Sequence, residues 1–437
     1  MKRRTYLTTA TVTATGLVLA GCMGDEEVEE EPGDDDDDVD DDVGDDENGD
    51  EETEEEEEEE ETDEEEDDDE TDSDLVGTFD DFETLEPWYD FIGAIEADTS
   101  RYYDGSQSAL LTPSDDDGQV RVRRELDEPI DVSEVAPGLA MAADNGGTVL
   151  IQLQDSDGDY VEFSQGVRPE MPLVRHNFGL TRVRGEPDLT EVTLLQIIRW
   201  FGDDAEGELW VDDFHFVPKP TTGKVMLQFH GGFETHYTEG LSILEAYDLP
   251  ATVFVPTDRI RPDDPASGDR LTEAQVETLA DAGWTIGSYS ARGMFLDDAG
   301  PTELESDVVD PIDWLEEHGY EDGARFFAFP SMRYDQESYE LVQEHYDLAF
   351  AGQSPSQGYA ANPHLCSVAS SPDPGEATAL LDWTAELGGI TTIPFYRLEE
   401  SESIEALEET AAHLDELVSA GDLDVITPQE LADEYVY

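Results

Sequence analysis

An apolar run that ends in two glycines, Lys224-Val225-Met226-Leu227-Gln228-Phe229-His230-Gly231-Gly232, opens the C-terminal half of this chain. A short apolar run of this kind is typical of a strand buried on both faces. Further such runs follow, and helical stretches separate several of them. Strand–helix alternation favours a parallel sheet, and seven strands predict an α/β barrel of the (β/α) type over residues 218–437. The expected strands are Val225–Phe229, Thr252–Val255, Thr285–Ser288, Phe326–Phe329, Leu348–Phe350, Ile390–Phe395 and Asp424–Ile426.

Three helix starts carry clear local signals. Thr272-Glu273-Ala274-Gln275 and Thr302-Glu303-Leu304-Glu305 have the capping-box pattern, in which the first and fourth side chains each bond the other residue's backbone N–H. Thr427-Pro428-Gln429-Glu430 adds a proline at the first helical position. These signals place helices directly after the expected strands, as a (β/α) fold requires.

Residues 75–217 have a different pattern. Short segments alternate apolar and polar residues, and turns rich in Asp and Gly separate them. No helical period is present, so the pattern predicts a β-sandwich of about eight strands ahead of the barrel. The clearest segments are Ser108–Leu111, Val120–Val122, Val149–Leu153, Tyr160–Phe163, Val192–Ile198 and Leu209–Phe216.

Residues 1–22 have the features of an export signal. A basic start is followed by a weakly apolar stretch that is too short to span a bilayer. Arg3-Arg4-Thr5-Tyr6-Leu7 resembles a twin-arginine signal, and Leu19-Ala20-Gly21-Cys22 resembles a lipobox with Cys22 as the lipidated residue. We expect an exported lipoprotein, anchored by lipid on the outer face of the cell membrane. A soluble secreted protein is the alternative.

The chain is strongly acidic, with 113 Asp or Glu against 21 Lys or Arg among 437 residues and a formal net charge of −92. Residues 23–74 hold 38 of the acids and no base, which predicts an extended disordered stalk. Nucleic acids and anionic headgroups are excluded as partners, because binding them needs clustered cations. The acidic excess continues through residues 75–437 and resembles the composition of haloarchaeal proteins. We expect the folded part to depend on salt, which screens its self-repulsion.

Several stretches of the C-terminal half resemble motifs of the polysaccharide deacetylase family, the NodB homology fold. The resemblance covers residues 224–437 from end to end. It implies a distorted (β/α)7-type barrel that acts on C–N bonds in carbohydrates. The matching stretches are Lys224–Gly232 (the place of the family's T-F-D-D-G motif), Leu241–Val255, Trp284–Ser290, Phe327–Tyr334, Gly388–Arg397 and Val425–Leu431.

Active members of that family bind a divalent metal through one Asp and two His, with a second Asp as base and a later His as acid. Carried over, the base position is His230, the metal positions are Gly231, Tyr289 and Gly293, and the acid position is Tyr396. Glycine has no ligand atom, and tyrosine is a poor zinc ligand at neutral pH. The resemblance therefore implies a catalytically degenerate barrel without a metal, and zinc is expected only if the protein is active.

The expected cleft keeps aromatic and polar side chains, and these are candidates for substrate binding. They are His230, Tyr289, Arg292, Tyr334 and Tyr396. Flat rings suit the faces of sugars, and hydroxyl groups can bond sugar hydroxyls. The alternative is that two of the tyrosines only fill the space that the metal leaves. No H-x-x-x-H, H-E-x-x-H or G-x-S-x-G pattern offers a second catalytic site.

Residues 75–217 also resemble the jelly-roll family of carbohydrate-binding modules. The resemblance rests on Asp81-Phe82-Glu83 with Trp88, on Asp104–Ser108 and on Trp210–Phe214. In that family the first and last strands often hold a structural calcium, and the matching residues here are Glu83 and Asp213. Carboxylate oxygens suit calcium, but in so acidic a chain a role as surface charges is an equal alternative.

Three hypotheses for function follow. The first is a cell-surface lipoprotein whose degenerate deacetylase-like domain binds envelope glycans or polysaccharide, with the membrane contacted through the lipid anchor only. The second is an active carbohydrate deacetylase, and the third is a structural envelope protein that binds no glycan. The substituted residues favour the first or the third.

Overall fold

The computed structural model describes residues 74–437 apart from 115–116, 203–205, 264–265, 267, 298 and 374. All of the described residues belong to one compact unit. The predicted signal of residues 1–22 with Cys22, and the predicted stalk up to residue 73, lie outside them. Among the helices that are described, none combines the length and the apolar character that crossing a membrane requires.

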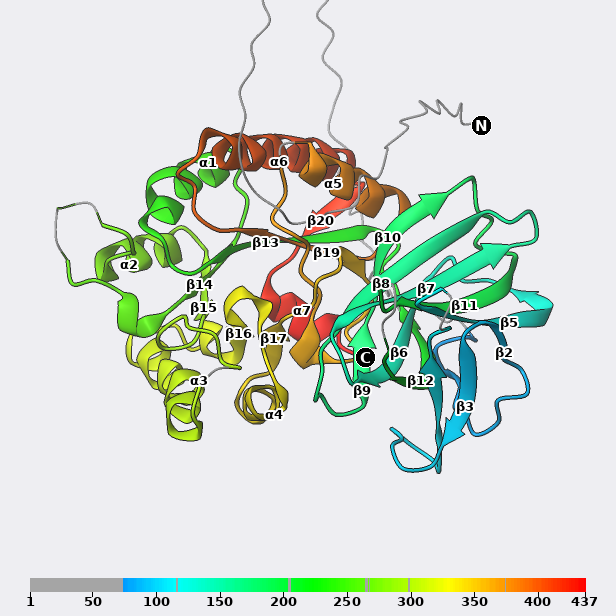
Figure 1. The fold of residues 1–437 in the computed structure, drawn as a ribbon. Coiled ribbons are helices and arrows are strands. Elements are labelled where there is room, and N and C mark those ends of the chain that lie inside the picture. The colour runs from blue at the N-terminus through cyan, green and yellow to red at the C-terminus, as the bar shows by residue number, and fades with distance from the viewer. Residues whose placement is uncertain are drawn as a thin grey trace, which may run out of the picture. The chain divides into compact units, whose positions relative to one another are not determined.

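Between Gly77 and Pro218 the described residues form twelve strands in two antiparallel arrays (Figure 1). One array has the order β3-β4-β12-β6-β9, with β1 also paired to β12, and the other runs β10-β8-β7-β11-β5-β2. Apolar side chains of both arrays, including Leu111, Met141, Ile151 and Leu195, meet in one core. The strands are β1 (Gly77–Asp80), β2 (Tyr89–Ile92), β3 (Ala94–Asp98), β4 (Ser108–Thr112), β5 (Gln119–Ile130), β6 (Val135–Ala143), β7 (Gly147–Asp155), β8 (Tyr160–Val167), β9 (Val174–Asn177), β10 (Gly179–Arg184), β11 (Val192–Trp200) and β12 (Leu209–Pro218).

From Gly223 onward strands alternate with helices. β13 is central, because it pairs in parallel with β14, β19 and β20. The parallel strands have the order β17-β16-β15-β14-β13-β19, and Figure 1 shows α1, α5 and α6 together along one side of them. Each of the seven expected strands is present within two residues of its predicted ends. The elements are β13 (Gly223–His230), α1 (Leu241–Glu245), β14 (Thr252–Val255), α2 (Glu273–Asp281), β15 (Thr285–Ser288), α3 (Pro301–Glu317), β16 (Phe326–Ala328), α4 (Gln336–His345), β17 (Leu348–Phe350), β18 (Ser356–Gln357), α5 (Glu376–Leu387), β19 (Ile390–Phe395), α6 (Ser401–Ala420), β20 (Leu423–Val425) and α7 (Pro428–Glu434).

A two-residue strand joins the two halves of the chain into one sheet. β18 pairs on one side with β19, through Gln357 and Ile390, and on the other side with β10, through Gly179 and Leu180. The result is a 14-stranded sheet that runs from β17 to β2. The expectation of a distinct (β/α)7 barrel is therefore corrected: the parallel strands continue into the antiparallel ones. One edge of β10 pairs with β8, and the other edge would otherwise expose unpaired backbone N–H and C=O groups. These groups pair with β18, which lies in the loop after β17.

Buried side-chain hydrogen bonds reinforce this junction. Asn177, at the end of β9, donates from Nδ2 to the carbonyl oxygens of Asn362 (2.8 Å) and Leu365 (3.0 Å). Its Oδ1 accepts from the backbone N–H of Asn362 at 3.0 Å. Asn362 in turn donates from its side chain to the carbonyl of Arg175 at 2.8 Å. Since both asparagines are buried, this network fixes how the loop of residues 351–366 lies against β9.

Candidate functional site

A cavity of about 170 Å³ lies where the parallel strands end. In a (β/α) fold this is the edge at which enzymes place their chemistry. His230 ends β13, Tyr289 follows β15, and Tyr396 follows β19. The sequence placed these three side chains at strand ends, and the structure brings them together in one cavity. The other lining residues are Gly231, Phe233, Pro256, Arg270, Gly293 and Ser331.

The His230 imidazole lines this cavity and is 1% exposed. Its Nε2 bonds the side-chain oxygen of Gln228 at 2.9 Å, and the Gln228 amide is oriented by its own bond to Met226 Sδ. His230 Nδ1 is buried and has no hydrogen-bond partner. The rings of Phe254, Tyr289 and Tyr396 meet His230 edge to face at 5.4–5.6 Å. Burial lowers the pKa of His230 to about 3, so the ring is neutral at physiological pH.

Two tyrosines form the aromatic wall of the cavity. The Tyr289 hydroxyl accepts a hydrogen bond from the backbone N–H of Ser331 at 2.9 Å. Burial raises the pKa of Tyr289 and of Tyr396 above the ordinary value, so both phenols keep their protons. The backbone carbonyl of Tyr396 accepts from His236 Nε2 at 2.8 Å. Within the described residues, the Tyr396 hydroxyl makes no hydrogen bond and can serve a ligand.

The two glycines of the site stand where the chain bends sharply. Gly231 has φ +98° and Gly293 has φ +61°, and both values favour glycine. A Cβ on Gly231 would lie 2.8 Å from Cε2 of Phe233, and a Cβ on Gly293 would lie 3.1 Å from Cβ of Pro256. The structure therefore excludes a larger side chain at Gly231 unless Phe233 moves.

Arg270 and Phe233 are site residues that sequence reasoning missed. The Arg270 guanidinium donates to the carbonyl of Gly231 and lies 4.0 Å from the centre of the Phe233 ring. An isolated bridge pairs Phe233 with Arg270 across the loops after β13 and before α2. No motif marks either residue. Only the cation–aromatic pairing, which needs the three-dimensional contact, identifies them.

Two of the predicted binding residues lie elsewhere. Arg292 forms a two-pronged ion pair with the buried carboxylate of Asp307 on α3, with distances of 2.6–3.1 Å. Tyr334 is buried against Phe329 and lies under the guanidinium of Arg168. It lines a separate cavity of about 280 Å³ that also includes Arg168 and neighbouring residues of β7 and β8. Neither side chain lines the cavity around His230.

The donor set of the His230 cavity does not suit the divalent cation that the family resemblance implies. Gly231 and Gly293 supply no ligand atom, and the Tyr289 hydroxyl keeps its proton while it accepts from Ser331. No carboxylate is among the lining residues. Over the described ranges, three or more His, Cys, Asp or Glu side chains nowhere group in a way that could hold a metal ion.

The two predicted calcium ligands are both engaged by protein donors. Glu83 accepts from the backbone N–H and the hydroxyl of Ser106, each at 2.6 Å. Asp213 accepts from Arg175 Nε at 2.6 Å and from the Thr78 hydroxyl at 2.7 Å. Hydrogen bonds from the protein lower the pKa of both carboxyl groups. A calcium ion at either position stays a prediction.

Comparison with known proteins gives the site its context. Residues 218–347 match the polysaccharide deacetylase family model. A curated relative, YxkH of Bacillus subtilis (strain 168), whose name assigns it polysaccharide deacetylase activity provisionally, is 23% identical over 126 residues, which are 29% of this chain and 43% of that protein. The match thus spans less than half of the relative's length.

Solved structures of family 4 carbohydrate esterases are also similar. The enzyme from Streptomyces lividans, in complex with acetate, is 16% identical and covers 47% of this chain and 94% of its own, with a TM-score of 0.34. The acetyl xylan esterase from Clostridium thermocellum is 20% identical and covers 48% and 89%, also with a TM-score of 0.34. The family match, which begins just before β13 and ends at Asp347, shows that this part of the chain is a polysaccharide deacetylase-like domain.

Proposed function

We propose that this protein binds glycan of the cell envelope through its deacetylase-like domain without hydrolysing it. One observation carries the proposal. The cavity at the strand ends is retained, but its lining is aromatic, imidazole and guanidinium, with no carboxylate. The cavity is kept as a binding site, while the side chains with which active members of the family bind metal and catalyse hydrolysis are replaced.

Hydrolysis of an acetamide needs a base, an acid and an electrophile. His230 is neutral, but a group with a pKa of about 3 is a very weak base at neutral pH. Tyr289 and Tyr396 hold their protons too tightly to donate them readily, because burial raises the pKa of each. The lining residues also do not fit a divalent metal. None of the three roles therefore has a suitable group.

Glycan binding fits the same residues. The rings of Phe233, Tyr289 and Tyr396 offer apolar faces, while the Arg270 guanidinium and the Tyr396 hydroxyl offer hydrogen bonds. The cavity is smaller than the usual 300–1,000 Å³ of pockets that enclose drug-sized ligands. It therefore suits one sugar residue, or the end of a chain, better than a long segment.

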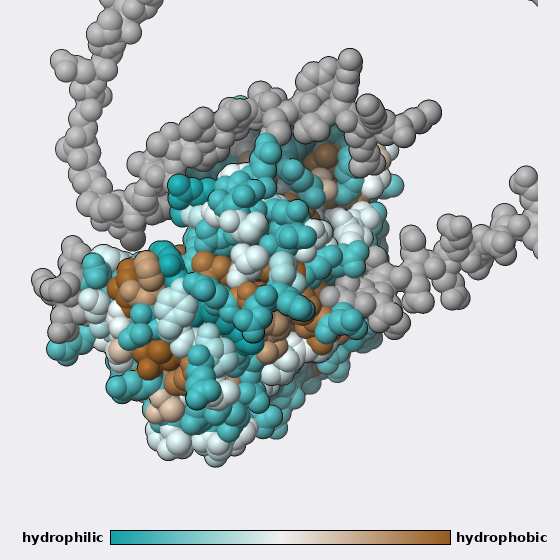
Figure 2. Space-filling model, turned by 90° about the vertical axis from the view of Figure 1, so that its right-hand side faces the viewer, coloured by the Kyte–Doolittle hydropathy of each residue, from teal (hydrophilic) through white to brown (hydrophobic). Residues whose placement is uncertain are grey.

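The N-terminal β-rich half offers a second surface for glycans. Phe91 on β2 and Trp200 at the end of β11 are 49% and 54% exposed, and Tyr89 is also exposed. The guanidinium of Arg123 lies 3.4 Å from the centre of the Phe91 ring. Figure 2 shows apolar side chains gathered in patches among hydrophilic ones on the face it views. Exposed aromatic residues of this kind support the proposed role of residues 75–217 as a carbohydrate-binding module.

The proposed location is the outer face of the cell membrane. The lipobox with Cys22 supports a lipid anchor, and the acidic residues 23–74 support a stalk that holds the folded part away from the surface. Metabolic labelling with a radioactive fatty acid tests the anchor. A Cys22→Ser variant is expected to lose the label and to appear in the medium.

Two assays on the purified protein, in molar salt, test the binding function. Acetate release from acetylated chitooligosaccharides should stay at the level of a heat-treated sample. Binding of envelope glycans on an array should be weakened in Tyr396→Ala, because that hydroxyl is free for a ligand. Tyr437→Ala, which removes an exposed tyrosine at the C-terminus, is the matched control and should bind normally.

Each contrary result identifies another hypothesis. Acetate release that disappears in His230→Ala would show an active deacetylase and overturn the proposal. Absence of binding to every envelope glycan would favour a structural role instead.

A further inference from the structure

Lys219 is a largely buried cation that forms no direct ion pair with any described residue. Its side chain follows β12 and is 7% exposed. Within the described residues Nζ makes no hydrogen bond, and the Glu134 carboxylate raises the pKa of Lys219 only enough to offset part of the effect of burial. Burial lowers the pKa of Lys219 to about 8, so the amine is still mostly protonated at neutral pH. A buried ammonium of this kind is unfavourable unless a partner compensates it.

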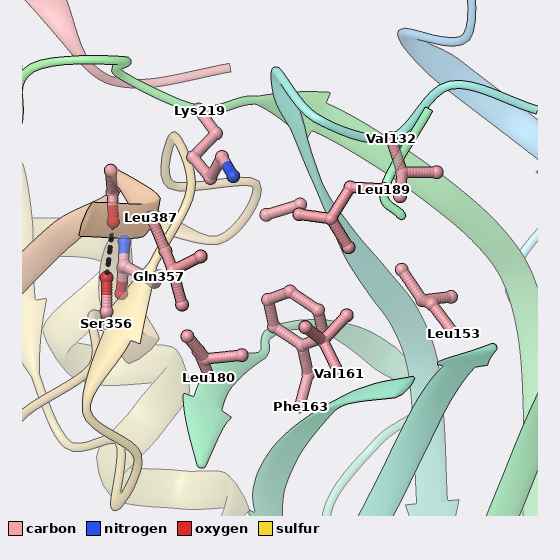
Figure 3. A pocket seen from close by; sticks show the side chains of 12 residues that line it. Val132, Leu153, Val161, Phe163, Leu180, Leu189, Lys219, Ser356, Gln357 and Leu387 are labelled. Atoms are coloured by element: carbon pink, nitrogen blue, oxygen red, sulfur yellow. Dashed lines mark hydrogen bonds between the residues drawn. The ribbon is translucent and has the colours of Figure 1, made fainter. Parts of the chain in front are cut away.

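The Lys219 side chain reaches into a cavity of about 20 Å³ at the junction of the two halves of the chain (Figure 3). Apolar side chains surround most of it, and Figure 3 shows Phe163, Leu180 and Leu189 on the side toward which Lys219 extends. The β-rich half supplies these residues, and the α/β half supplies Lys219, Gln357 and Leu387.

Gln357 supplies a second unused donor in the same cavity. Its Oε1 accepts from the backbone N–H of Ser367 at 2.5 Å, and this bond fixes the orientation of the amide. Its Nε2 is buried without a hydrogen-bond partner. The Ser356 hydroxyl, which also lines the cavity, donates to the carbonyl of Gly388. The unused polar groups are therefore an ammonium and an amide N–H, and both donate.

We propose that this cavity binds a small monovalent anion, held by Lys219 Nζ and Gln357 Nε2. Two donors at one cavity, with no carboxylate among its lining residues, match the needs of an anion, and the surrounding apolar side chains strengthen the attraction by lowering the local dielectric constant. The volume exceeds the 10–15 Å³ that one water needs. It admits a halide or the smallest carboxylates and excludes large polyatomic anions. A halide and a short carboxylate could both accept from these two donors.

A bound anion would act as a bridge between the two halves. Lys219 and Gln357 belong to the α/β half, whereas the apolar wall belongs mainly to the β-rich half. An occupied site therefore stabilises their junction, and the size of this stabilisation depends on which anion is present. General screening of the acidic surface depends on ionic strength instead, so the two effects can be separated.

Crystals of the protein soaked in bromide test the site directly. An anomalous peak between Lys219 and Gln357 is expected, and a soak in formate or acetate that removes the peak would identify a carboxylate as the preferred ligand. A formate or acetate soak that leaves the peak would identify a halide. Absence of a peak under either anion would overturn the proposal.

Thermal unfolding at constant ionic strength gives a second readout. Replacing a bulky anion by chloride should raise the unfolding midpoint of the wild type. Lys219→Met should lose this dependence, with the apparent chloride affinity reduced by roughly tenfold or more. Gln357→Glu keeps the acceptor for Ser367 and adds a carboxylate to the cavity that Lys219 also lines, so this variant should also lose the dependence on chloride.

The matched control is Lys224→Met, because Lys224 is paired with Asp424 at 2.8 Å and lies outside this cavity. It should keep the wild-type response to chloride. A variant of Lys219 or Gln357 that responds to chloride as the wild type does would show that the stabilisation arises elsewhere.

Discussion

Replacing Asn177 by alanine tests whether the two halves of the chain are held together as described. The Asn177 side chain bonds Asn362 and Leu365 across the junction, and all of these bonds are buried. Alanine is small enough to fit and removes every one of them. Asn177→Asp is the companion variant, because it keeps Oδ1 but turns the donating Nδ2 into an oxygen that faces two carbonyl groups.

The expected loss follows from the groups left behind. The Asn362 carbonyl also accepts from the Leu365 N–H at 3.2 Å, so it stays bonded. The Asn362 N–H and the Leu365 carbonyl lose the partner that Asn177 provides. An unpaired buried group costs about 1–3 kcal/mol, so Asn177→Ala should lower the free energy of unfolding by about 2–6 kcal/mol. Asn177→Asp should lose at least as much, since it adds a buried charge.

Urea denaturation in molar salt, followed by circular dichroism, measures this free energy. The wild type should unfold in one transition, because a single sheet crosses the junction. Gln336→Ala is the control: its side chain bonds Glu340 on the exposed face of α4, and its removal should cost only about 0.2–0.5 kcal/mol. A loss below about 0.5 kcal/mol for Asn177→Ala, or two separate wild-type transitions, would refute the reasoning.

Three further results are expected. Lowering the salt to ~0.1 M should unfold the acidic protein because screening is lost, and an unchanged circular dichroism spectrum would contradict this. Acid should destabilise the fold. Burial lowers the pKa of His176 to about 4 and of His230 and His236 to about 3. In the unfolded chain the histidine pKa is ~6.5, so as the pH falls the unfolded chain takes up protons before the folded one does. The unfolding midpoint should therefore fall as the pH drops below about 6.5, and less steeply in His230→Gln. Gly231→Asp should lose roughly 1–3 kcal/mol through its positive φ and the contact with Phe233 and should bind no zinc by calorimetry; stoichiometric zinc would show that the cavity can be restored.

The parallel strands could be predicted because a strand buried on both faces appears in the sequence as a short continuous apolar run. Thr252–Val255 and Thr285–Ser288 are found with their predicted ends. The search for alternating segments missed β6, because its nine residues are all buried and include Pro137, Gly138 and four alanines, so they show neither alternation nor the bulky apolar run of the parallel strands. It also missed β18, which has only two residues and no pattern of its own. So short a strand forms because β10 and β19 are positioned to pair with it on both sides.

The helix starts show how local signals compete. Thr272 forms its capping box, with Oγ1 accepting from the Gln275 N–H at 3.3 Å, and Thr427 forms one with Glu430. Thr302 does not, because α3 begins at Pro301, two residues before Glu303, and Gly300 becomes the N-cap. Proline is well suited to the first helical position, since it has no N–H to satisfy there.

The candidate site could be predicted only where residues end parallel strands. His230, Tyr289 and Tyr396 meet for that reason. Tyr334 lies elsewhere because Ser331 and Met332 adopt left-handed backbone angles, with φ near +53°. This turn brings Ser331 into the cavity, while Tyr334, three residues on, faces another. Long-range pairing of this kind has no counterpart in the local sequence.

The sheet that runs from β17 to β2 also sets a fixed span between the two proposed glycan contacts. β13, which carries His230, and β2, which carries Phe91, are eight strand spacings apart in the sheet order. At about 4.8 Å per spacing this is about 40 Å along the sheet, and each strand between them is hydrogen-bonded to the next. A short oligosaccharide could occupy one contact at a time. A long polymer could bridge both contacts and gain avidity from the linkage. The protein would then bind long glycans more tightly than short ones.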